Sequence, residues 1–139
     1  MNYIVYAVLA LVAYSLVPPL VDIATEEIPS NTTALISNTI LVVVALAAVV
    51  YTGEWDVSNF TGRNAVYAYT AGVFLAVGIL AYYRALALGP VSVVVPIFGM
   101  FIVGSAVVGV VVFDETVTAR KVVGVALAVV AVYLVSVEP

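Results

Sequence analysis

The chain contains neither cysteine nor histidine, and its 139 residues include only 4 basic and 8 acidic side chains. The missing cysteines exclude disulfides and thiol nucleophiles, and the missing histidines remove imidazole bases and the commonest transition-metal ligands. A net charge of −4 leaves no basic patch for nucleic acid. We therefore expect no cofactor, no bound metal and no nucleic-acid partner.

Charge of either sign is scarce, at 9% of residues, whereas 65% of the residues are hydrophobic. A soluble domain needs roughly a quarter of its residues charged to cover its surface. This chain cannot do so, and most of its surface must therefore face lipid. The composition predicts a multi-pass protein of the cell membrane, whose first partner is the lipid bilayer.

Long apolar runs define the organisation of the chain. A bilayer core needs about 20 apolar residues in helical form. The chain offers five such runs, at residues 3–21, 32–51, 65–88, 91–113 and 119–137. Valine is frequent in them, but the runs are two to four times longer than a typical strand and do not alternate between polar and apolar residues. The expected fold is all-α, with residues 1–139 forming a single domain of five transmembrane helices.

Proline, glycine and short polar residues predict where these helices begin and end. Pro18-Pro19 is expected to end the first helix, and Ser30 or Asn31 to cap the second. Gly89 is expected to close the third helix at its C′ position, with Pro90 opening the fourth. An acid or a threonine of residues 114–118 can cap the fifth.

Arg84 is a lone formal charge near the end of the third apolar run. It can contact an anion or a carboxylate in a translocation path. Alternatively, it can extend to the headgroups, because it lies about one turn from the helix end. The neighbouring Tyr83 can form an aromatic wall of a site, or it can belong to the aromatic belt at the membrane surface.

Few other polar features interrupt the apolar runs, and each has a structural as well as a functional interpretation. Asn38 can bridge two helices or contact substrate, because an asparagine in lipid needs a partner. Pro96 leaves one backbone carbonyl without its usual donor, which is either an inert kink or part of a site. The candidate substrate-binding residues are Arg84, Tyr83, Tyr14, Asn38, Ser92 and Pro96.

Carboxylates are missing from the interior of the predicted helices. General acid–base chemistry therefore has few agents, and an intramembrane enzyme is not expected. A transporter that depends on a buried carboxylate for proton coupling also has no obvious candidate residue.

The last part of the chain, from Ala81, reads Ala-Tyr-Tyr-Arg-Ala-Leu-Ala-Leu-Gly-Pro and continues with Pro96 in the next helix. Glu115 then follows that helix, and Gly124 lies nine residues later. These features resemble the EamA domain of the drug/metabolite transporter superfamily. Members of that family often carry an arginine near the position of Asn38, where this chain differs.

The resemblance implies a transporter of small metabolites or drugs. Most members have ten helices in two five-helix halves of inverted topology, with the substrate path between the halves. This chain corresponds to one half, and a second copy inserted upside down would complete the inverted pair. We therefore expect a homodimer that works by alternating access, with the first, third and fourth helices along the path and with Arg84 favouring a substrate that carries a carboxylate or phosphate.

The basic residues bear on the orientation of such a dimer. Arg63, Arg120 and Lys121 fall on the amino-terminal side of the predicted helices, and Arg84 on the other side. This bias favours a cytoplasmic amino terminus, whereas dual insertion requires a bias nearer zero. An antiparallel homodimer, a parallel dimer and a separate inverted partner all remain open. The alternative function is a structural or assembly subunit of a membrane complex that transports nothing itself.

Overall fold

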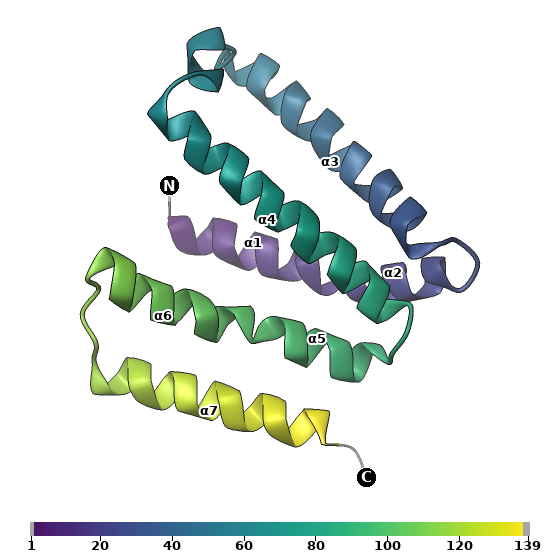
Figure 1. Ribbon diagram of the computed structural model, residues 1–139, viewed down its shortest axis with the longest axis vertical. Helices are drawn as coiled ribbons and strands as arrows, with labels where there is room; N and C mark the ends of the chain where they lie inside the picture. Colours follow the sequence, from purple (N-terminus) through teal and green to yellow (C-terminus); the bar gives the residue numbers. More distant parts are fainter. Residues whose placement is uncertain (1, 138–139) are drawn as a thin grey trace. The chain divides into compact units, whose positions relative to one another are not determined.

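The computed structural model describes residues 2–137, and the described part of the chain is built from α-helices and one short 3-10 helix. The helices are α1 (Tyr3–Ser15), α2 (Val17–Thr25), α3 (Ser30–Thr52), η1 (Val57–Phe60), α4 (Arg63–Leu86), α5 (Val91–Gly99), α6 (Phe101–Phe113) and α7 (Ala119–Ser136). They form five apolar spans long enough to cross a membrane, of which the first is α1–α2 and the fourth is α5–α6 (Figure 1). The predicted all-α membrane fold is confirmed.

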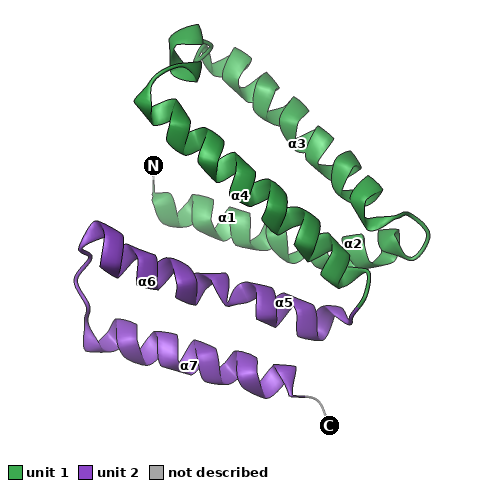
Figure 2. Cartoon of the chain, in the orientation of Figure 1, with its two compact units in different colours: residues 1–88 green, residues 89–139 purple. Residues whose placement is uncertain are grey.

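The chain divides into two compact units, residues 1–88 and residues 89–139 (Figure 2). We call them unit 1, which contains α1 to α4, and unit 2, which contains α5 to α7. That residues 1–139 act as a single domain stays a prediction.

The first span differs from the sequence expectation. Pro18 and Pro19 do not end the helix; they lie in the first turn of α2, which continues to Thr25. The first amides of a helix have no intrahelical partner, so a proline there loses no hydrogen bond. The break instead falls at Leu16, between α1 and α2. The two prolines therefore interrupt the span without terminating it.

In unit 1, α3 and α4 pack side by side in antiparallel directions, and α2 packs against both (Figure 1). The expectation that Ser30 or Asn31 caps α3 is wrong, because Pro29 occupies the N-cap position. Its carbonyl oxygen accepts hydrogen bonds from the amides of Thr32 and Thr33 at 2.8 and 3.0 Å. Ser30 becomes a buried residue of the first turn. At the other end Gly53, with φ of 73°, closes α3 in the left-handed conformation that glycine adopts without strain.

The loop between α3 and α4 gathers several aromatic rings. The ring of Trp55 lies 5.7 Å from that of Phe60, centroid to centroid. The hydroxyl of Tyr69, on α4, donates to the carbonyl oxygen of Phe60 at 3.0 Å. Asp56 accepts a hydrogen bond from the Ser58 amide at 2.9 Å, and this bond lowers the pKa of the Asp56 carboxyl.

In unit 2, α7 packs against both α5 and α6. The fourth span is broken at Met100, four residues after Pro96. Pro90 lies at the N-cap of α5 rather than at its first helical residue. The expectation that Gly89 closes the preceding helix at its C′ position is wrong, because α4 ends at Leu86 with Ala87 as its C-cap. The predicted cap of α7 is confirmed in part.

That cap is Thr118, whose hydroxyl oxygen accepts a hydrogen bond from the Lys121 amide at 3.2 Å. The bond satisfies one of the free amides at the start of α7. It also fixes the direction in which the first turn of α7 leaves the preceding loop.

Candidate functional site

A buried polar cluster joins α3 to α4 in unit 1. Its α3 residues recur at a helical spacing on one face, and Ser30 and Thr33 are each only 7% exposed. The α4 side contributes Tyr83, which is 3% exposed, and the apolar Leu86 on the same helix is 2% exposed. The helix period places residues i, i+3 and i+7 on one face. This face of α3 therefore forms the inner wall of unit 1.

One hydrogen bond between side chains crosses from helix to helix in this cluster. The hydroxyl oxygens of Tyr83 and Ser37 lie 3.0 Å apart. Ser37 also lies within donor distance of the carbonyl oxygens of Thr33 and Ala34, at 3.0 and 3.2 Å. Since a serine hydroxyl carries one proton, the arrangement is satisfied when Ser37 donates to its own helix and Tyr83 donates to Ser37.

Asn38 follows Ser37 and is half-buried. Its side-chain amide nitrogen donates to the carbonyl oxygen of Ala34 at 2.8 Å. This local bond leaves the side-chain oxygen available as an acceptor. Asn38 is thus satisfied in part by its own helix and does not need a bond to α4.

Arg84 is exposed although it adjoins the buried Tyr83. It belongs to the last turn of α4, where a cation interacts favourably with the helix dipole. Within residues 2–137 the geometry gives Arg84 no ion pair, whereas Lys121 has one with Glu115. The guanidinium therefore remains available to an anion or to lipid headgroups.

The other predicted residues lie on exposed or half-exposed parts of their units. Tyr14, on α1, is 69% exposed. Ser92 is exposed in the first turn of α5, and Pro96 is half-buried one turn later. The Ser92 carbonyl lacks its usual donor, because residue i+4 is Pro96. Ser92 thus presents both a hydroxyl and an under-satisfied carbonyl.

The structure therefore brings only part of the predicted set into contact with other side chains. Tyr83 is hydrogen-bonded to Ser37, the residue before Asn38. Arg84 and Tyr14 take no part in that bond, and Ser92 and Pro96 belong to unit 2. Ser37, Ser30 and Thr33 were not among the predicted site residues. Their common signal was the helical spacing of three short hydroxyl residues in the first half of an apolar span.

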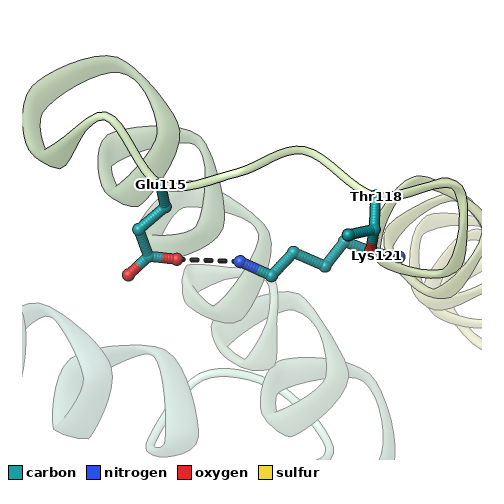
Figure 3. Close-up of polar contacts among 3 residues, drawn as sticks. All are labelled: Glu115, Thr118 and Lys121. Atoms are coloured by element: carbon teal, nitrogen blue, oxygen red, sulfur yellow. Dashed lines mark hydrogen bonds and ion pairs between the residues drawn. The ribbon is translucent and has the colours of Figure 1, made fainter.

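A groove of about 440 Å³ lies between α6 and α7. Its walls are mainly valine and alanine, and its polar groups are the carboxylate of Glu115 and the ammonium of Lys121. These two groups form an ion pair of 3.0 Å (Figure 3). The predicted site residues do not line this groove, so the two candidate sites of the chain are distinct.

The helices and the sparse polar groups inside them define a multi-pass helical membrane protein. Residues 1–137 match the EamA-like transporter family, and the chain belongs to that family. It is therefore a membrane transporter.

The chain is also similar to a Sinorhizobium protein described as an uncharacterized transporter in the cobO 3′ region. The two are 30% identical over 122 residues, which cover 87% of this chain and 86% of the relative. No solved structure matches the chain.

Proposed function

We propose that this transporter works as a half-size subunit, in which two copies form the substrate path and expose it to each side of the membrane in turn. The similarity to the Sinorhizobium protein supports this proposal. The 122 aligned residues are 86% of that relative, so it has about 142 residues (122/0.86). A chain of that length has room for about five spans of 20 residues with their connections. A transporter of ten spans would need two such chains.

The broken fourth span is the observation that carries the proposal. The Ser92 carbonyl has lost its usual donor to Pro96, and Ser92 is exposed on its unit. Lipid offers no hydrogen bonds, so polar backbone in a span is tolerated where protein or a water-filled cavity covers it. A second copy would supply the covering protein, and an aqueous substrate path would supply the water-filled cavity. Broken helices also surround substrate sites in other membrane transporters.

We assign Arg84 to the contact with substrate. Its exposed guanidinium has no carboxylate partner in the described chain, and a cation inside a membrane seeks an anion. The transported solute would accordingly carry a carboxylate or a phosphate. Tyr83 and Asn38 support the same region of unit 1, and Tyr14, Ser92 and Pro96 complete the proposed path. The proposed lining is thus provided by the first, third and fourth spans, with Asn38 from the second.

Uptake into proteoliposomes tests the assignment of Arg84. With a panel of radiolabelled carboxylates and phosphate esters, the unmodified protein should give saturable uptake. Arg84→Ala should abolish it, whereas Arg84→Lys should retain part of it because the charge remains. Arg63→Ala is the matched control, since Arg63 lies at the opposite end of the same helix. Unchanged uptake of every solute by Arg84→Ala would remove Arg84 from the site.

Cysteine labelling tests the antiparallel arrangement, and the absence of native cysteine makes the background from the protein nil. Asn2→Cys and Val137→Cys lie at opposite ends of an odd number of spans. An impermeant thiol reagent applied to intact cells should label about half of the molecules at each position if both orientations insert. Labelling of Val137→Cys alone would contradict the antiparallel homodimer and leave a parallel dimer or an inverted partner.

A further inference from the structure

The groove between α6 and α7 has a polar end and an apolar body. Its apolar lining comes from two helices of the same unit, with Val107, Val110 and Val111 on α6 and Val122, Val125 and Ala126 on α7. A volume of about 440 Å³ lies within the range of small-molecule pockets, roughly 300–1,000 Å³. The groove is therefore large enough to hold a ligand rather than a single water molecule.

The backbone holds Glu115 at the end of this groove. Asp114, with φ of 51°, turns the chain out of α6. The Glu115 amide then donates to the carbonyl oxygen of Gly109 at 3.2 Å, which brings the Glu115 side chain back over α6. The absence of a side chain at Gly109 makes room for it, because a Cβ there would lie 3.3 Å from the Glu115 carboxyl carbon.

Lys121 reaches the same place from the other wall. Thr118 fixes the first turn of α7 by accepting from the Lys121 amide, and the Lys121 ammonium then lies 3.0 Å from a Glu115 carboxylate oxygen (Figure 3). The Lys121 and Glu115 side chains are 51% and 56% exposed. An ion pair so exposed contributes little to stability, so new partners can replace it at little cost.

The position of this ion pair along the spans defines the chemistry of an occupant. The fourth span ends at Phe113 and the fifth begins at Ala119, so residues 114–118 form a turn at the membrane surface. The groove thus extends from the headgroup level toward the acyl chains. An occupant that is apolar over most of its length fits the body of the groove, and a cation and an anion at its end can pair with Glu115 and Lys121 in place of their bond to each other.

We propose that this groove binds one acyl chain of a zwitterionic phospholipid, whose ammonium contacts Glu115 and whose phosphate contacts Lys121. This assignment goes beyond the proposed transport function, and it does not depend on a second copy. Charge complementarity selects the zwitterion, because an anionic headgroup would satisfy Lys121 but meet the negative charge of Glu115. The bound lipid fills a wall of unit 2 that side chains leave open.

A photoreactive lipid tests the proposal with the purified full chain in detergent. The probe is phosphatidylethanolamine with a diazirine in one acyl chain, and peptide mapping reads the crosslinked residues. Crosslinks should concentrate at residues 107–111 and 122–126. Ala126→Phe fills the groove and should reduce these crosslinks by about tenfold. Ala131→Phe is the matched control, since it adds the same ring to an exposed position of α7 outside the groove, and it should leave them unchanged.

A second comparison isolates the headgroup without changing the volume of the groove. Competition by unlabelled phosphatidylethanolamine should exceed that by phosphatidylglycerol, and the double variant Glu115→Gln with Lys121→Gln should lose this preference. Equal competition by the two lipids, or crosslinks spread evenly over all five spans, would overturn the proposal. The proposal would also be overturned if Val110→Cys formed a disulfide between two copies equally well with and without lipid. A second chain, not a lipid, would then occupy the groove. Substrate uptake is not measured, so failure here does not affect the proposed transport.

Discussion

Unit 1 and unit 2 are both apolar, but they are packed in different ways. Unit 1 buries several side chains at the end where α2, α3 and α4 meet, including Ala34 and Leu86 at 2% exposure each. In unit 2 the described parts of α5, α6 and α7 contain no buried residue. Unit 2 instead has a groove of about 440 Å³ between α6 and α7.

The difference shows how helices associate when lipid surrounds them. Lipid tails are as apolar as leucine, so burying apolar surface against another helix gives little driving force in a bilayer. Close packing of small residues and hydrogen bonds between helices provide it instead. Unit 1 has both, in Ala34 and in the bond from Tyr83 to Ser37. In the described part of unit 2 no helix residue is buried, and the printed side-chain bond between α7 and the end of α6 is the exposed pair of Lys121 and Glu115, so we expect lipid or a second chain to complete its packing.

The largest effect should come from removing the aromatic side chain at the centre of unit 1. Tyr83→Ala deletes a ring that is 3% exposed and also breaks the bond to Ser37. We expect a loss of about 3 kcal/mol in the free energy of unfolding, at the low end for aromatic truncation because lipid, not water, is the surrounding medium. Titration with SDS in mixed micelles, followed by circular dichroism, measures it. Tyr67→Ala, at an exposed position of the same helix, should cost little; equal losses would deny that unit 1 has a distinct core.

The next effect compares enlargement of one alanine in each unit. Ala34→Leu inserts volume where the side chain is 2% exposed, and it should destabilise the protein by about 1–3 kcal/mol. Ala126→Leu adds the same volume at the open groove of unit 2, and it should change stability by less than about 0.5 kcal/mol. The same SDS titration checks both. A similar cost at both positions would mean that unit 2 is packed as tightly as unit 1.

A smaller effect should come from the hydrogen bond alone. A double-mutant cycle with Tyr83→Phe and Ser37→Ala isolates the coupling between the two hydroxyls. We expect a coupling energy of about 0.6 kcal/mol, the average for side-chain hydrogen bonds in a membrane protein. It should be modest because Ser37 keeps its acceptors on α3, the carbonyls of Thr33 and Ala34. If the changes in free energy of unfolding caused by the two single substitutions simply add, the contact is stabilised by packing and not by the hydrogen bond.

The smallest effect should come from the ion pair of unit 2. Glu115→Gln or Lys121→Gln should each change the free energy of unfolding by less than about 1 kcal/mol, because both groups are more than half exposed. Raising the salt concentration should reduce even this difference by screening the charges. A loss as large as that of Tyr83→Ala would show that the ion pair holds α6 to α7, and that the contrast between the two units is misplaced.

Several features of the fold could be predicted because they depend on short stretches of sequence. The five apolar runs gave the five spans, since a bilayer accepts helices of about 20 apolar residues. Thr118 was among the predicted caps of α7 and caps it. The helix ends at Pro18-Pro19, Ser30 and Gly89 were predicted wrongly. Each of these helix ends depended on which of several adjacent residues takes the capping position of the helix. The sequence offered more than one suitable residue at each end.

The candidate site was harder to predict than the spans. Arg84 and Tyr83 are neighbours in the sequence and were assigned together, yet Tyr83 is buried and Arg84 is exposed. Successive residues of a helix point about 100° apart, and the contact with α3 decides which one faces inward. The pairing of Tyr83 with Ser37, 46 positions away, could not be read from either local pattern.

The sequence by itself therefore determined the membrane location, the number of spans and the scarcity of charge within them, because hydropathy and length act residue by residue. Tertiary structure alone decided that Ser37 and Tyr83 meet, that unit 1 buries side chains while unit 2 leaves a groove, and that Glu115 reaches Lys121 across it. The physical reason is that these outcomes depend on the rotation and approach of whole helices. In lipid that approach is set by a few small residues and hydrogen bonds rather than by the hydropathy of each span.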